Sequence, residues 1–168
     1  MRPARTYALA LLAAYPAWLA MLAAHELGHA LHAWLSGGRV ARVEIPLWGF
    51  SRTEFSANPH PQFVAWGGAV WGVCVPTALA VLTRTIRGLP RWIRRSADLF
   101  AGFCWVANGA YLGVGAIDGI GDAGDLVRAG APRATVMALG FAGLAVGLWW
   151  WHAATRRHPP PPSAATRL

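Results

Sequence analysis

Residues 7–35 read YALALLAAYPAWLAMLAAHELGHALHAWL, and the first 18 of them carry no charge. His25, Glu26 and His29 then follow within the same apolar pattern. Residues four apart lie on one face of a helix, so His25 and His29 could hold one metal ion from successive turns. Glu26 would lie beside that ion as a general base. The stretch predicts a membrane helix carrying a zinc-binding motif; the alternative is a histidine pair that only forms hydrogen bonds within a packed helix.

The composition indicates a membrane protein. Hydrophobic residues make up 55% of the 168 residues and charged residues only 13%, whereas soluble domains have about 25% charged residues. All 15 basic residues are arginines, and they fall between and beyond the apolar runs. We therefore interpret the net charge of +8 as a topology signal and expect a lipid bilayer, and no nucleic acid, as a partner.

Three more uncharged runs cover residues 63–82, 99–117 and 135–151. A membrane-spanning helix needs about 20 mostly apolar residues, so the sequence predicts an all-α membrane protein with about four transmembrane helices. The first helix, continued to Leu35, would be about 44 Å long at 1.5 Å per residue. It must therefore tilt, bend or protrude from the hydrocarbon core, and Pro16 is a natural place for a kink.

Residues 39–55 have a different pattern. Apolar and charged residues alternate there with a period near two, and Pro46 and Gly49 lie between the two halves. This pattern predicts a small β-hairpin after the first helix, with an irregular loop as the alternative. A segment this polar would lie at the membrane interface and would not cross the bilayer.

The chain is expected to form one membrane-embedded domain over residues 1–152. Residues 153–168 include four consecutive prolines and predict a disordered tail. Arginines are more numerous in the N-terminus, the second loop and the tail than in the first and third loops. The positive-inside rule then places both termini in the cytoplasm. We expect a multi-pass protein of a bacterial cell membrane.

A catalytic zinc ion normally has three protein ligands, so two histidines are not enough. His32 shares their helix face but would lie about 10 Å along the axis from His25. The better source is the carboxylate cluster that follows the third apolar run, namely Asp118, Asp122 and Asp125. An alternative role for Asp122 is to cap the N-terminus of a helix.

These motifs resemble those of the site-2 protease family of intramembrane zinc metallopeptidases. The resemblance rests on the motif at residues 25–29, GGRV at 37–40, the hairpin and a glycine-rich second helix. GDAGDL at 121–126, followed by GAP at 130–132, is similar to the short, B-like branch of that family. The resemblance implies that one Zn²⁺ is bound by His25, His29 and Asp122, and that Glu26 activates water. Asp118 remains a rival third ligand because Ile117-Asp118-Gly119 is similar to another segment of the family, and Asp125 ranks third.

The resemblance also implies the reaction, which is hydrolysis of peptide bonds within or next to transmembrane segments of membrane proteins. Asn108 is a candidate for orienting substrate or stabilising the oxyanion, and its alternative role is an interhelical hydrogen bond. The hairpin could accept an unwound substrate as an added strand. The competing hypothesis is a protease-fold membrane protein without activity that acts as a binding or chaperone-like partner. Retention of Glu26 favours the enzyme, and the lack of paired repeats disfavours a transporter or channel.

Overall fold

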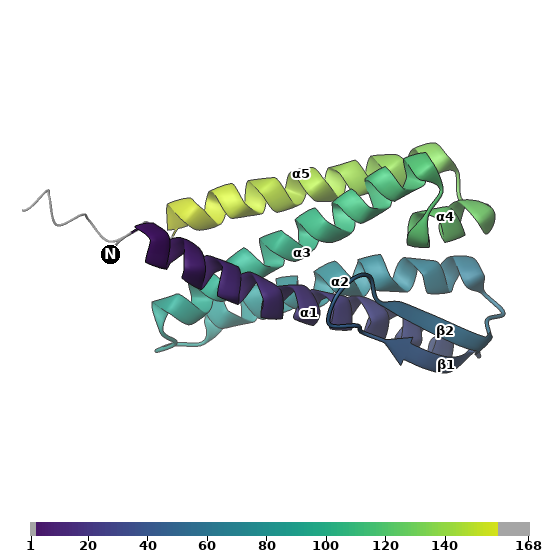
Figure 1. Ribbon diagram of the computed structural model, residues 1–168, viewed down its shortest axis with the longest axis horizontal. Coiled ribbons are helices and arrows are strands. Elements are labelled where there is room, and N and C mark those ends of the chain that lie inside the picture. The colour runs from purple at the N-terminus through teal and green to yellow at the C-terminus, as the bar shows by residue number, and fades with distance from the viewer. Residues whose placement is uncertain (1–2, 158–168) are drawn as a thin grey trace, which may run out of the picture.

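The computed structural model describes residues 3–157, with side chains described from residue 12 onward. This part of the chain forms five helices and one pair of strands, in the order α1 (Pro3–Leu35), β1 (Arg39–Glu44), β2 (Arg52–Ala57), α2 (Pro61–Thr85), α3 (Arg91–Asp118), α4 (Gly121–Arg128) and α5 (Arg133–Arg157). In Figure 1, α3 and α5 run antiparallel along one side of the bundle and α1 packs against α2. Helix α2 also packs against α3 and so joins the two pairs.

Glycines let these helices approach each other closely. Gly28 of α1 faces Gly67 of α2, and a side chain on either residue would overlap the backbone of the other. Gly109 of α3 meets Gly140 of α5 in the same way. Small residues at helix contacts are typical of membrane bundles, where close van der Waals packing replaces the hydrophobic effect between helices. The Gly28–Gly67 contact fixes the position of the histidine motif along α2.

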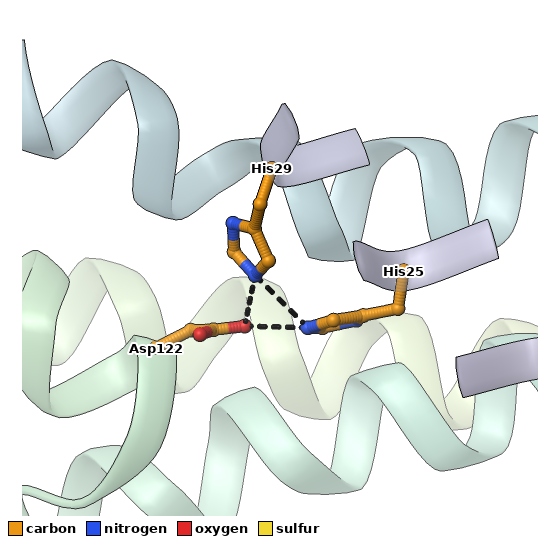
Figure 2. Close-up of side chains that lie close together, drawn as sticks. All are labelled: His25, His29 and Asp122. Atoms are coloured by element: carbon orange, nitrogen blue, oxygen red, sulfur yellow. Dashed lines mark hydrogen bonds and ion pairs between the residues drawn. The ribbon is translucent and has the colours of Figure 1, made fainter. Parts of the chain in front are cut away.

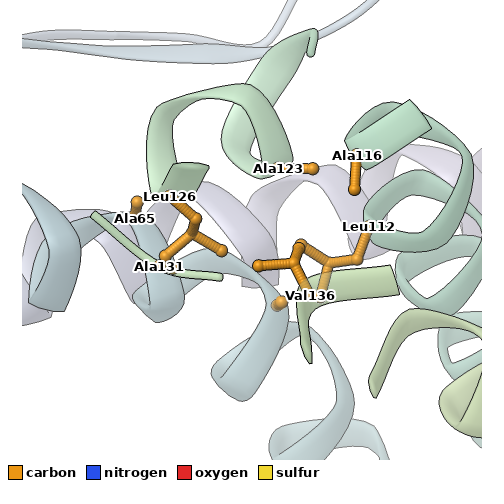
Figure 3. Packing of buried hydrophobic residues seen from close by; sticks show 8 residues of the cluster. Ala65, Leu112, Ala116, Ala123, Leu126, Ala131 and Val136 are labelled. Carbon is orange, nitrogen blue, oxygen red and sulfur yellow. The ribbon is translucent and has the colours of Figure 1, made fainter. Parts of the chain in front are cut away.

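The short helix α4 is held by an apolar cluster at one end of the bundle (Figure 3). Leu126 of α4 is fully buried against Ala65 of α2, Leu112 of α3 and Val136 of α5. Fully burying a leucine side chain contributes about 1.5–3 kcal/mol. Burial of Leu126 therefore anchors the segment that carries Asp122.

Three helices, α2, α3 and α5, are long and apolar enough to cross a membrane. Three of the four expected spans are therefore supported by length and composition. The first expected span, in α1, is not among these candidates, which were sought only among the described residues.

Two predicted boundaries were wrong. Helix α3 begins at Arg91, before the uncharged run that starts at residue 99, so Arg91, Arg94 and Arg95, which were counted in the arginine-rich second loop, lie in a helix. Helix α5 continues to Arg157, so residues 153–157 belong to a helix and not to the predicted tail. The rest of that predicted tail, residues 158–168, lies outside the described residues. Arginine is a good helix former, so charge ended the apolar runs without ending the helices.

The predicted hairpin is confirmed. Strands β1 and β2 pair antiparallel, with Val43 opposite Thr53 and Glu44 opposite Arg52. The hairpin lies beside the C-terminal half of α1 (Figure 1). Its connecting loop folds back along α1, where the hydroxyl of Tyr15 donates a hydrogen bond to the carbonyl oxygen of Leu47 at 2.9 Å. The hairpin is thereby held over the helix that carries the histidine motif.

Candidate metal centre

Three side chains from two distant parts of the sequence converge between α1 and α4 (Figure 2). The Nε2 atoms of His25 and His29 lie 2.7 and 3.2 Å from the Oδ2 atom of Asp122. The two Nε2 atoms are 3.1 Å apart. All three ligand atoms lie within 4.8 Å of one another, so His25, His29 and Asp122 form a group that could hold a metal ion.

Both imidazoles are oriented by their other ring nitrogen. The Nδ1 atom of His25 donates to Oδ1 of Asn108 at 2.7 Å, and that of His29 donates to the carbonyl oxygen of Val64 at 2.8 Å. Metal-binding histidines almost always make such a second hydrogen bond, which fixes the tautomer and the ring plane. These hydrogen bonds turn both Nε2 atoms toward Asp122, where each could bind a metal ion once it carries no proton.

A glycine covers the two ligand nitrogens. Gly68 of α2 is buried, and a Cβ atom on it would overlap Nε2 of His25 and of His29. Because glycine has no side chain, the backbone of α2 can lie close to the two nitrogens without filling the space beside them. The space beside both Nε2 atoms depends on the absence of a side chain at position 68.

Asp122 lies in the first turn of α4 and not at its N-cap, which is Ile120. The alternative role considered for Asp122, capping of this helix, is therefore not the one it has in the structure. Burial by itself would raise the pKa of Asp122, but hydrogen bonds and charge interactions with His25 and His29 outweigh it and hold the pKa well below its usual range. Asp122 is thus an ionised carboxylate facing two imidazoles.

The rival carboxylates lie elsewhere. Asp118 is exposed at the last turn of α3. Asp125 is exposed and pairs with Arg128 at 2.5 Å. Neither belongs to the group of possible ligands. His32 is also outside that group, since its Nδ1 atom donates to the carbonyl oxygen of Phe63 at 2.7 Å and its ring stacks on Phe63.

Glu26 is buried next to His25, with 2% of its surface exposed. Its Oε1 atom accepts a hydrogen bond from the Ser51 hydroxyl, and its Oε2 atom accepts one from the Thr53 hydroxyl, both at 2.6 Å. Both hydroxyls belong to the hairpin region. The carboxylate predicted to act as the base is therefore held between α1 and β2.

Asn108 is committed to protein contacts. Its Oδ1 atom accepts the hydrogen bond from His25, and its Nδ2 atom donates to the carbonyl oxygen of Cys104 at 2.9 Å. The structure places this side chain as an interhelical bridge from α3 to α1, which was the alternative to contact with substrate. This position suits orientation of His25; Asn108 also lines the smaller cavity, and its predicted contact with substrate stays a prediction.

Two cavities adjoin the site and share Glu26 and Ser51 in their walls. The larger, of about 440 Å³, contains polar groups and is also lined by His29, Asp122 and Arg128. The smaller, of about 250 Å³, is mainly apolar; its lining includes His25 and the side chains Trp18, Met21, Leu22, Phe50 and Tyr111. The site therefore opens to a polar space on one side and an apolar space on the other.

Some residues of the site were not identified from the sequence. Ser51 and Thr53 contact Glu26, Gly68 covers the histidines, and Tyr111 lies with its ring 6.0 Å from that of His25. Alternation in β2 carried part of this information, because residues 51 and 53 share one face of an extended chain. Tyr111 stood out with Asn108 as a polar residue of the run 99–117, but its place near His25 was not predicted. Nothing in the sequence separated Gly68 from the other glycines of its apolar run.

No protein-family model matches the chain, and no curated protein or solved structure matches it.

Proposed function

We propose that this protein is an intramembrane zinc metalloendopeptidase of the site-2 protease type, which hydrolyses peptide bonds within or next to transmembrane segments. The proposal is carried by one observation: His25, His29 and Asp122 converge with their ligand atoms within 4.8 Å, beside the buried carboxylate of Glu26. Two histidines and one carboxylate form a known ligand set of catalytic zinc, which leaves a fourth position for water.

The donor geometry is close to what zinc requires. Bonds of about 2.0–2.1 Å in a tetrahedral site place ligand atoms roughly 3.3 Å apart, and the three separations here are 2.7, 3.1 and 3.2 Å. The largest difference, about 0.6 Å between Asp122 and His25 relative to the tetrahedral spacing, would close with a small outward movement of Asp122. Two histidines and a carboxylate also suit ferrous iron. The glutamate beside the first histidine favours zinc hydrolysis, because that spacing supplies a base for water.

The residues then have separate tasks. A zinc ion at this site would supply Lewis acidity toward a water molecule and a peptide carbonyl. Glu26 accepts the proton of the attacking water and passes it to the leaving amine. Asn108 and the carbonyl oxygen of Val64 hold the two imidazoles in place. The polar cavity admits water, and the apolar cavity accepts an apolar side chain of the substrate.

Placement in a membrane supports this substrate class. Helices α2, α3 and α5 are candidate spans, and α1, whose motif faces α2, completes a four-span bundle in the proposed arrangement. Both termini then lie on one side, which the arginine distribution assigns to the cytoplasm of a bacterial cell. The paired strands have free edges to which an unwound segment of a membrane protein could add.

The alternative is a protein of the same architecture that binds membrane partners without cleaving them. Purified protein in detergent should contain about one zinc per chain, as measured by mass spectrometry of the metal. Incubation with peptides from digested cell membranes should then yield new termini. Glu26→Gln should retain zinc and lose at least about a hundredfold in cleavage rate.

Glu54→Gln is the matched control, because Glu54 lies on the exposed face of β2. It should retain both zinc and activity. Cleavage by Glu26→Gln at the rate of the unaltered protein would refute the mechanism. Stoichiometric iron without zinc would refute the assignment of the metal. Zinc binding without any cleavage would favour the non-proteolytic alternative.

A further inference from the structure

The carboxylate of Glu26 is held by the hairpin region and not by a cation. Each of its oxygens accepts one short hydrogen bond, from Ser51 and from Thr53, at 2.6 Å in both cases. Across the part of the chain with described side chains, no arginine or histidine forms an ion pair with Glu26. Burying an ionised carboxylate without compensation is costly, and these two hydroxyls supply direct hydrogen bonds that offset part of that cost.

The strand pattern explains why both hydroxyls reach the same carboxylate. Side chains alternate between the two faces of a strand, so positions 51 and 53 point the same way. Arg52 lies between them, on the opposite face, and pairs with Glu44 at 2.7 Å. The register of β2 against β1 places Thr53 opposite Val43 and Arg52 opposite Glu44. Ser51 directly precedes the strand, and its hydroxyl reaches the same carboxylate as that of Thr53.

The loop before β2 is fixed at two further points. Tyr15 donates to the Leu47 carbonyl oxygen at 2.9 Å, and the Phe50 ring stacks near that of Tyr111 with centroids 6.2 Å apart. These contacts attach the loop to α1 and to α3. Ser51 follows Phe50 directly, so its hydroxyl is placed by the same contacts.

We propose that Ser51 and Thr53 are positioning residues for Glu26, and that the hairpin and the general base act as one unit. This inference rests on the proposed function. Each hydroxyl occupies one lone pair of its carboxylate oxygen, and the remaining lone pairs are available to water in the adjoining cavities. Hydrogen bonds of this charge-assisted kind are short and directional, so they fix the carboxylate plane relative to the two histidines.

Kinetics can test this role. Thr53→Val keeps the shape of the side chain and removes its hydroxyl, and Ser51→Ala removes the other. Each should lower kcat by about tenfold to a hundredfold with KM changed by less than about twofold, because the loss affects orientation of the base and not substrate binding. Zinc content should be unchanged. Thr53→Ser and Ser51→Thr restore a hydroxyl and should recover most of kcat.

Ser56→Ala is the matched control. Ser56 is an exposed hydroxyl residue of the same strand that donates to the Arg39 carbonyl oxygen, away from Glu26. It should leave kcat unchanged. Equal losses in Ser56→Ala and Thr53→Val would overturn the proposal, as would unchanged kcat in the Ser51→Ala/Thr53→Val double variant.

Hydrogen exchange tests the same contact without proteolysis. Glu26→Ala should speed backbone exchange in β2 by about tenfold, the factor expected for loss of hydrogen bonds to a charged group. Ser51→Ala/Thr53→Val should do the same, and combining all three changes should add little, because they remove one shared interaction. Exchange in α3 and α5 should stay constant.

Fully additive effects of the substitutions, or no effect on exchange in β2, would overturn the proposal. Non-additive effects on exchange in β2, in a protein that cleaves no peptide, would support the contact between Glu26 and the two hydroxyls. The same result would refute the proposed protease function, and with it the catalytic part of this inference.

Discussion

The Nδ1 atom of His25 lies 2.7 Å from the Oδ1 atom of Asn108, across the space between α1 and α3. The amide nitrogen of Asn108 is used by the Cys104 carbonyl oxygen, so its oxygen can only accept the proton of His25. This contact keeps a proton on Nδ1 of His25 and turns Nε2 toward Asp122. A residue far from the histidine motif in sequence thus controls which nitrogen the motif presents.

Replacing Asn108 should weaken metal binding without removing a ligand. Removing a hydrogen-bond partner of a metal ligand typically weakens metal affinity by about 10–100-fold. We therefore expect the zinc affinity of Asn108→Ala to fall by a factor in that range. Competition with a chelator measures it. Asn58→Ala, which alters a cavity wall without touching either histidine, should bind zinc normally. Equal affinities in Asn108→Ala and the unaltered protein would contradict the role given to Asn108.

Among the aspartates, only Asp122 should be essential for stoichiometric zinc. Asp122→Ala removes the carboxylate that lies at hydrogen-bond distance from both histidines. Asp118→Ala and Asp125→Ala change exposed side chains outside the ligand group and should retain the metal. Metal analysis of the three purified variants decides among them. Loss of zinc in Asp118→Ala with retention in Asp122→Ala would reverse the assignment.

A single methyl group at position 68 should abolish the site. Gly68→Ala places a Cβ atom on both ligand nitrogens, and overpacking of this kind costs about 1–3 kcal/mol even where neighbours can move. We expect zinc content to fall at least tenfold, the factor that corresponds to about 1.4 kcal/mol. Gly143→Ala is the control, because its Cβ would lie at 3.4 Å from Gly109 in ordinary contact. Normal zinc content in Gly68→Ala would show that the two imidazoles lie elsewhere.

Acid should destabilise the chelator-treated protein through Asp122. The pKa of this carboxyl is lowered in the folded state by His25 and His29. Its contribution to stability is therefore fully present above the unfolded value of about 3.9 and is lost as the pH falls below it. Thermal unfolding followed from about pH 6 to pH 3 should show a drop in Tm that Asp122→Asn reduces. Glu54→Gln should leave the drop unchanged, and parallel curves for Asp122→Asn and the unaltered protein would disprove the linkage.

Much of the fold was accessible from the sequence because apolar length is a physical requirement of a bilayer. The runs at 63–82, 99–117 and 135–151 became α2, α3 and α5, and alternation at 39–55 became the hairpin. Helix ends were misplaced because a charge stops an apolar run but not a helix, as Arg91 and Arg157 demonstrate. The short helix α4 has no uncharged run, and its burial through Leu126 arises only when α2, α3 and α5 meet.

The candidate site also has a part that the sequence predicts and a part that only the folded chain reveals. His25, Glu26 and His29 are linked by helical periodicity, so local sequence was enough to group them. The choice between Asp118 and Asp122 depends on the chain reversal after α3, where Gly119 adopts a left-handed conformation at φ 70°. That turn leaves Asp118 outside and brings Asp122 under α1. The contact of Thr53 with Glu26 likewise requires the hairpin to fold over α1, which no local pattern specifies.

The larger cavity beside Glu26 also bears on how water reaches the site. Hydrolysis consumes one water molecule for each bond, and lipid is a poor source of it. A cavity needs only about 10–15 Å³ of probe-occupied volume for each water, whereas this one measures about 440 Å³. Under the proposed function, water held in this cavity could supply many turnovers, and exchange with bulk water would need only to match the average rate of cleavage.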